Sequence, residues 1–168
     1  KELARSSRVK LTVIDRSNHH LFQPLLYQVA AAGLSPAEIA VPIRSLFSNK
    51  ENVSVAQDNV LSVDAEKKMV LGENGDYSYD YLILAAGATH NYFGNEHWEM
   101  RAPGLKTLSQ ATEIRRRIMI AFEKAEIEED PEERKKLLTF IVVGGGPTGV
   151  ELAGAIGEMT RFTLARDF

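Results

Sequence analysis

The sequence predicts an α/β fold that combines parts of two βαβ units with a small antiparallel β-meander. Three observations carry this prediction. A β-branched run ends in Asp15, a glycine-rich turn at 144–149 joins an apolar run to a helical pattern, and short alternating runs lie between them. Both the acidic strand end and the glycine turn are typical of parallel sheets that are crossed by helices.

Composition limits the classes of protein to which the chain can belong. It has 168 residues, 44% of them hydrophobic, and a net charge of −3. A substantial core is therefore expected, and nucleic acid is disfavoured as the main partner. The sequence has no run of about 20 apolar residues and no signal peptide, so a membrane role would be peripheral or lie outside these residues.

The chain contains no cysteine. This composition excludes a disulfide framework, a zinc–thiolate site and a redox-active dithiol within these residues. The adjacent His19 and His20 lack spaced acidic or thiol partners, so we expect no metal site there.

The first half of the chain is expected to start with a strand at residues 9–14, whose apolar character suits a parallel sheet. Residues 21–47 are mostly helical in pattern, with Ser35 as a cap and Pro36 at a first helical position. Residues 53–55 and 60–63 alternate with period two, and the apolar residues 69–71 follow after a charged turn, which together predict a meander of short antiparallel strands.

The second half is expected to begin with a longer apolar strand at residues 79–86. Helical periodicity follows over residues 107–129, and Asp130 with Pro131 starts a second short helix. A strand at 139–143, the glycine turn and a helix from Val150 onward complete the chain. Residues 1–5 resemble the last turn of a helix, so we expect the chain to be a fragment.

Gly144, Gly146 and Gly149 form the pattern G-x-G-x-x-G between an expected strand and an expected helix. The first glycine permits the tight turn, the second lets the backbone approach a pyrophosphate, and the third lets the helix pack on the strand. The alternative is a glycine-rich turn without a ligand. The acid that would read the ribose is expected about 20 residues further on, and Asp167 is instead expected on the surface, so NADH and NADPH are not distinguished.

Asp15 is expected to play the corresponding ribose-binding role for a first nucleotide. Its own glycine loop would lie about 20 residues upstream, before Lys1. The alternative is a turn aspartate at a strand end. Two such sites in one polypeptide suggest a flavin paired with a nicotinamide, because hydride passes from one to the other.

Six stretches resemble the type II (non-proton-pumping) NADH dehydrogenase family, namely residues 11–16, 18–30, 33–36, 79–90, 102–107 and 143–154. The resemblance covers nearly the whole chain, and residues 18–30 are its most specific part. It implies two Rossmann-like domains with the FAD domain interrupted by the NADH domain. Residues 1–108 would be the FAD-binding domain without its first strand and glycine loop, 109–137 a helical connection, and 138–168 the start of the NAD(H)-binding domain.

The resemblance also implies the site residues. FAD would contact Asp15 and Arg16 at its ribose, Val60 near adenine, and the pyrophosphate or flavin at three successive residues, Ala86, Gly87 and Ala88. NADH would lie over the glycine turn and the start of its helix, at Gly144, Gly146, Pro147, Thr148, Gly149 and Val150. Glu151 matches a glutamate near the nicotinamide and flavin, although a carboxylate that merely favours a helix N-terminus is the alternative. Ala86 replaces the threonine of many relatives, which removes a hydroxyl.

The function that this resemblance implies is FAD-dependent NADH:quinone oxidoreductase. Hydride would pass from NADH to FAD, and electrons would pass on to a membrane quinone. The enzyme would sit peripherally on the cytoplasmic face of the bacterial inner membrane, or on the inner mitochondrial membrane, through a C-terminal region outside this chain, and a homodimer is possible.

Two alternatives remain open. One is a flavoprotein NAD(P)H reductase with a protein acceptor such as ferredoxin, and the other is a non-catalytic nucleotide-sensing module. Disulfide reductases are disfavoured because the regions that carry their cysteines contain none.

Overall fold

The computed structural model describes residues 2–163, with side chains described as far as Arg161. The chain divides into two compact units. The first consists of Lys1–Leu21 and Ala40–Gly87, and the second of Phe22–Ile39 and Ala88–Phe168. Mixed helices and strands confirm the α/β class, whereas the domain boundaries expected from the sequence stay a prediction.

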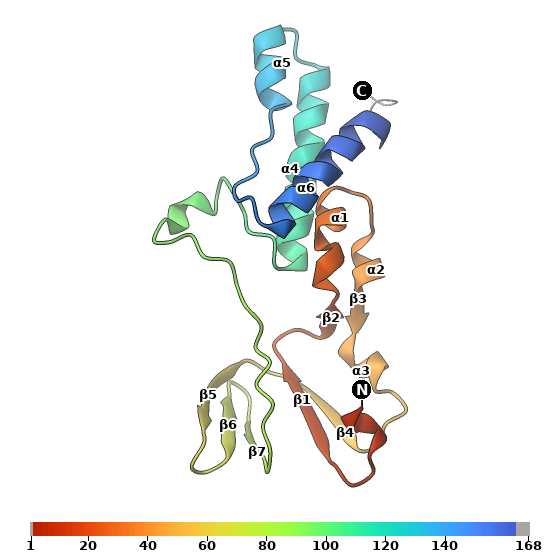
Figure 1. Cartoon of the computed structure of the whole chain (residues 1–168), viewed down its shortest axis with the longest axis vertical. Helices are drawn as coiled ribbons and strands as arrows, with labels where there is room; N and C mark the ends of the chain where they lie inside the picture. Colours follow the sequence, from red (N-terminus) through yellow and green to blue (C-terminus); the bar gives the residue numbers. More distant parts are fainter. Residues whose placement is uncertain (1, 164–168) are drawn as a thin grey trace. The chain divides into compact units, whose positions relative to one another are not determined.

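A parallel pair of strands forms the first unit's sheet. After a short 3₁₀ turn, η1 (Leu3–Arg5), strand β1 (Leu11–Asp15) pairs in parallel with β4 (Val53–Gln57), and Asp15 lies opposite Gln57 (Figure 1). The prediction that residues 53–55 belong to the meander is therefore wrong. Alternation along a strand indicates which side chains share a face, but it does not identify the partner strand.

The meander itself is formed by the next three strands, β5 (Val60–Asp64), β6 (Met69–Gly72) and β7 (Asp76–Ser78), which pair antiparallel in that order. Its existence was predicted, but no strand was predicted at the residues of β7. A second antiparallel pair joins β2 (His19–Leu21) to β3 (Ala40–Pro42), and the short helix α3 (Ile43–Leu46) follows it.

The apolar run at residues 79–86 does not form the strand predicted for it. Residues 80–86 of this run are exposed, with Tyr81 94% and Ile83 72% exposed. A strand exists only when another strand accepts and donates its backbone hydrogen bonds. No strand in the described part of the chain pairs with this run.

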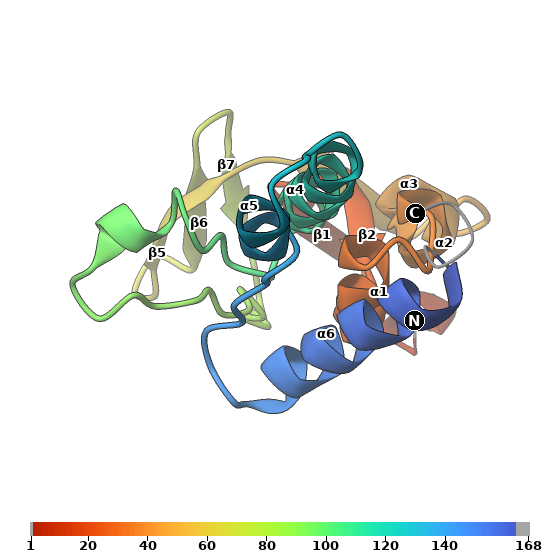
Figure 2. The same ribbon diagram turned by 90° about the horizontal axis from the view of Figure 1, so that it is seen from above.

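Helices make up the second unit. They are η2 (Gln23–Leu25), α1 (Leu26–Ala30), α2 (Pro36–Ile39), η3 (Glu96–Trp98), α4 (Leu108–Glu126), α5 (Pro131–Leu137), α6 (Pro147–Glu158) and the π-helical turn η4 (Met159–Thr163). Helix α1 packs against both α4 and α6 (Figures 1 and 2). The core cluster is centred on Ile118, Phe122 and Met159.

The predicted starts of α2, α4 and α5 are confirmed. Thr107 accepts from the Gln110 amide at 3.2 Å while Gln110 accepts from the Thr107 amide at 3.1 Å, which is a complete capping box. Asp130 accepts from the Glu132 amide at 2.9 Å, ahead of Pro131. Ser35 precedes α2, and Pro36 is the first residue of that helix.

The strand predicted at residues 139–143 is absent as well. Phe140 instead stacks on Phe122, with ring centroids 5.9 Å apart, while Ile141 is exposed. This run also lacks a paired neighbour among the described residues, so it remains extended without a ladder.

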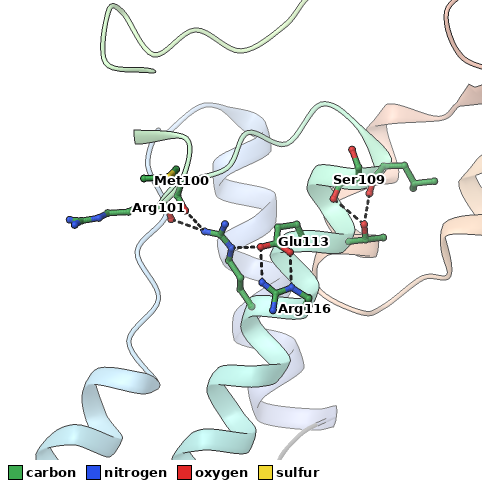
Figure 3. A network of polar contacts seen from close by, with 8 residues as sticks. Met100, Arg101, Ser109, Glu113 and Arg116 are labelled. Carbon is green, nitrogen blue, oxygen red and sulfur yellow. Dashed lines mark hydrogen bonds and ion pairs between the residues drawn. The ribbon is translucent and has the colours of Figure 1, made fainter. Parts of the chain in front are cut away.

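A charged network ties α4 to the loop before it (Figure 3). Glu113 accepts from Arg116 and Arg117 at 2.7 Å each. Arg117 also donates to the Met100 carbonyl at 2.8 Å, which anchors the loop. The hydrogen bonds from Arg116 and Arg117 lower the pKa of Glu113 from its ordinary 4.5 to about 2.

Replacing Glu113 with glutamine is expected to flatten the dependence of stability on acid pH. Because its folded pKa is depressed, Glu113 stabilises the fold above about pH 4.5, and this contribution is lost as the pH falls towards about 2. Urea midpoints measured across this window should fall less for Glu113→Gln than for the wild type. Glu123→Gln, which removes an exposed carboxylate from the same helix, should keep the wild-type slope. Equal slopes for all three proteins would contradict the assignment.

Candidate dinucleotide site

The glycine turn adopts the backbone conformation that its glycines predict, although the strand expected before it is absent. Gly144 has a φ of +102°, which side-chain-bearing residues rarely adopt. Gly146 is the N-cap of α6 and Pro147 its first residue, so the helix starts earlier than the predicted Val150. A Cβ on Gly149 would overlap the Gly144 carbonyl oxygen, which explains why the third glycine is needed.

The start of α6 is suited to bind an anion. The first amides of a helix lack intrahelical acceptors, and Pro147 has no N–H, so Thr148 and Gly149 supply the donors inside the first turn. The helix has 12 residues, and no acidic side chain lies in its first turn. Its partial positive charge is therefore not offset locally, as a phosphate site requires.

Glu151 is the fifth residue of α6, counted from Pro147. The helix dipole acts mainly on the first turn, so this position weakens the interpretation of Glu151 as a simple helix-start carboxylate. The side chain instead lines an open cleft of about 490 Å³ between α1 and α6. Such a volume lies within the range of small-molecule sites, roughly 300–1,000 Å³.

One face of α6 forms one wall of this α1–α6 cleft. Glu151, Gly154, Ala155 and Glu158 line it at a spacing of three and four residues, which places them on the same side of the helix. Gly154 and Ala155 are small, so the wall between the two carboxylates is low. A flat ring could approach the helix backbone at this point.

Helix α1 and the residues after it form the opposite wall, through Tyr27, Gln28, Ala31 and Gly33. The Gln28 side chain donates to the Tyr27 hydroxyl at 3.2 Å, so the two polar groups are held together. Tyr27 belongs to the stretch that carries the family resemblance. Gln28 and Glu158 were not predicted as site residues, although the spacing of Glu158 from Glu151 along one helix face could have indicated it.

Asp15 and Arg16 lie at the carboxyl end of β1, where α/β proteins bind their ligands. Asp15 is exposed and accepts from the Ser17 amide at 2.7 Å, as a turn aspartate does. Its backbone carbonyl accepts from the Asp58 amide at 3.0 Å. The structure thus combines the strand-end position with the turn geometry that was considered as its alternative.

Val60 is the first residue of β5 and lies two residues after Asp58, whose amide donates to the Asp15 carbonyl. Ala86 and Gly87 lie in the extended run that follows, and Ala88 begins the next segment of the second unit. Gly87 has a φ of +75°, and a Cβ placed on it would meet nothing within 4 Å. The backbone is therefore open to close approach at this residue.

Residues 2–163 contain no group of three or more histidine, cysteine or acidic residues arranged to hold a metal. The Nδ1 atom of His19 lies 3.0 Å from the side-chain oxygen of Asn18. Within the same range, no helix has the length and apolar character needed to cross a bilayer.

A glycine turn that opens a helix and an acidic end of a parallel strand are features of dinucleotide-binding α/β proteins. The profile of the pyridine nucleotide-disulphide oxidoreductase family matches residues 1–164. The chain belongs to this family, although it has no cysteine and thus no dithiol of its own.

Individual proteins show a more specific similarity than the family profile does. The chain is 49% identical to the type II NADH:quinone oxidoreductase Ndh of Mycobacterium tuberculosis, over 100% of this chain and 37% of that protein. It is 35% identical to a probable NADH dehydrogenase of Dictyostelium discoideum, over 97% and 38%. The structure of NDH2 from Plasmodium falciparum in complex with NADH has a TM-score of 0.82, with 31% identity over 94% of this chain and 34% of that one. The chain therefore spans a little over a third of each relative.

Proposed function

We propose that the protein is an FAD-dependent NADH:quinone oxidoreductase of which this chain forms part. The observation that carries the proposal is that the helix opened by the glycine turn also brings Glu151 into the α1–α6 cleft. The proposed phosphate site at the start of α6 and the proposed reaction cleft would thus lie on one rigid helix. The mycobacterial relative, 49% identical, is named for this reaction.

NADH would lie along the start of α6. The backbone of Gly144, Gly146 and Gly149 would face the pyrophosphate, and the first helical turn at Pro147, Thr148 and Val150 would complete the contact. The Glu151 carboxylate would accept a hydrogen bond from the carboxamide of nicotinamide and hold the ring in the cleft. Its role in this proposal is to orient the hydride donor, not to abstract a proton.

FAD would lie along residues of the first unit and the residue that directly follows it in the chain. Asp15 and Arg16 would hold the ribose, and Val60 would lie near adenine. Ala86, Gly87 and Ala88 would face the pyrophosphate or the flavin, a role that the open surroundings of Gly87 favour. FAD supplies the hydride-accepting and electron-passing chemistry when bound, while these residues position it.

The same proposal includes an electron acceptor, a membrane contact and an assignment of domains. The electron acceptor would be a membrane quinone, and the protein would dock on the cytoplasmic face of the bacterial inner membrane, or on the inner mitochondrial membrane, through a region outside this chain. Residues 1–108 would belong to the FAD domain, 109–137 to a helical connection and 138–168 to the NAD(H) domain. A homodimer would suit this arrangement.

Purification of the full-length protein tests the function directly. We expect bound flavin that absorbs visible light, is bleached by NADH without oxygen, and is reoxidised by a soluble quinone. Reoxidation by ferredoxin but not by quinone would replace the proposal with the protein-acceptor reductase. Absence of any bound flavin would favour the nucleotide-sensing module.

Replacing Glu151 with alanine is expected to lower kcat/KM for NADH by about 10–100-fold, the effect of losing a hydrogen bond to a charged group. Glu151→Gln keeps one acceptor oxygen and should lose less. Stopped-flow flavin reduction by NADH measures both variants, and Glu123→Ala on α4 provides the control. If Glu151→Ala reduced its flavin at the wild-type rate at every NADH concentration, the role assigned to Glu151 would be wrong.

A further inference from the structure

A buried carboxylate lies where β4 ends. Asp58 directly follows the last residue of that strand and is only 3% exposed. Among the charged residues in the described part of the chain, Asp58 is the one that is buried. An ionised carboxylate out of water is unfavourable unless hydrogen bonds replace the water it has lost. Its presence therefore needs a compensating set of donors.

Three neighbouring residues supply those donors. The Tyr77 hydroxyl donates at 2.8 Å, the Asn59 amide at 2.8 Å, and Asn74 donates from its backbone at 3.1 Å and from its side chain at 3.0 Å. Burial alone would raise the pKa of Asp58, but the bonds from Tyr77, Asn74 and Asn59 outweigh burial and lower the pKa. Asp58 is thus held as an anion.

These donors belong to the meander. Asn74 lies in the turn between β6 and β7, Tyr77 lies on β7, and Asn59 immediately precedes β5. A Cβ on Gly72, at the end of β6, would collide with the Asp58 carboxylate. The Asp58 side chain therefore holds the chain that leaves β4 against the meander.

The backbone amide of Asp58 and the side chain of the preceding Gln57 bond to residues at the end of β1. The Asp58 amide donates to the Asp15 carbonyl at 3.0 Å, and the Gln57 side chain donates to the Arg16 carbonyl at 3.3 Å. Asp58 thus links the acidic end of β1 to the meander, where β5 begins with Val60. Its carboxylate fixes the meander, and its amide fixes the turn that carries Asp15.

Given the FAD site proposed above, we propose that Asp58 is a positioning residue for the adenosine half of FAD. It touches neither ribose nor adenine, but it sets the distance between the residues assigned to each, Asp15 with Arg16 and Val60. A ligand that contacts both sides loses affinity when either side drifts, because binding requires the two sets of contacts at once. The reacting ring lies at the other end of the dinucleotide, so the chemistry itself should not change.

The full-length holoprotein tests this role through Asp58→Asn, which keeps the shape and removes the charge. We expect the dissociation constant of FAD to rise about 10-fold or more. The FAD concentration that restores half of the NADH oxidation activity should rise in parallel. The value of kcat at saturating FAD and the KM for NADH should remain those of the wild type, a separation that general loss of structure would not give.

Asp64→Asn is the matched control. Asp64 also has a lowered pKa, which its hydrogen bond from the Lys67 amide at 2.9 Å chiefly causes, but it caps only the local turn between β5 and β6. The FAD affinity of this variant should equal that of the wild type. An equal loss in both variants would show general softening of the meander and overturn the proposal.

Tyr77→Phe serves if Asp58→Asn does not fold, because it removes one donor and leaves the carboxylate. Its dissociation constant for FAD should rise several-fold, and an unchanged value would overturn the proposal. A wild-type protein without FAD would refute the proposed function instead. A wild type with FAD and an Asp58→Asn variant of equal affinity would refute only the role of Asp58.

Discussion

Replacing Gly149 with alanine is expected to slow flavin reduction by NADH about 100-fold, the scale of rate loss that follows a 1 Å misplacement of a substrate-positioning group. The added Cβ would overlap the Gly144 carbonyl oxygen, so either the turn or the start of α6 must shift. Both carry the backbone amides that are proposed to face the pyrophosphate. Flavin reduction at increasing NADH concentrations in the full-length protein measures the change.

Gly157→Ala is the matched control for this variant. It adds the same methyl group to the same helix, at a position where a Cβ meets nothing within 4 Å. Alanine favours a helix over glycine by about 1 kcal/mol, so stability should rise slightly and flavin reduction by NADH should stay unchanged. If the flavin of Gly149→Ala were reduced as fast as that of Gly157→Ala, the close approach of Gly149 to Gly144 would have no functional importance.

Replacing Phe122 with alanine is expected to cost about 3–5 kcal/mol in free energy of unfolding, the usual loss for a buried phenylalanine. Phe122 is 8% exposed, stacks on Phe140 and belongs to the cluster with Ile118 and Met159. Truncation would leave a cavity where α4 meets the chain around α6. Such a loss is a large part of a typical domain's stability, roughly 5–15 kcal/mol.

Urea unfolding followed by circular dichroism measures this loss. Phe93→Ala removes the same aromatic ring from a position that is 85% exposed and should change stability by no more than about 0.5 kcal/mol. Similar losses in the two variants would indicate that the cluster around Phe122 does not dominate the stability of the second unit.

The starts of α2, α4 and α5 could be predicted from the sequence because their determinants are local. Thr107, Asp130 and Ser35 each make a hydrogen bond to a residue two or three positions ahead. Pro36 and Pro131 then follow their capping residues at the first helical position. The information lies within one turn of chain, so a single sequence contains it.

Strands were predicted less well because their determinants are distant. Residues 53–55 have the alternation of a meander strand, yet they pair in parallel with β1, about 40 residues earlier. The runs at 79–86 and 139–143 have strand composition but no paired partner in the described part of the chain. Composition indicates that a run can form a strand, whereas only a partner makes it one.

Part of the candidate site could be predicted from the sequence. The glycine turn and Asp15 follow from spacing, whereas Glu151 depended on the family resemblance. Asp58 was missed because an aspartate beside an asparagine resembles any polar turn, and only the tertiary fold buries it. Gln28 was missed because its place in the cleft depends on the packing of α1 against α6.

Helix α1 contacts α4, which begins roughly 80 residues further along the chain. During synthesis at about 5–20 residues per second, α1 therefore leaves the ribosome several seconds before α4 exists. In that interval α4 cannot yet pack against Leu26, Val29 and Ala30, the residues of α1 that are buried in the folded protein. The strands β1 and β4 close a much shorter loop and can pair first. Nascent chains are thus most open to chaperones, and to mispairing, between the emergence of α1 and that of α4.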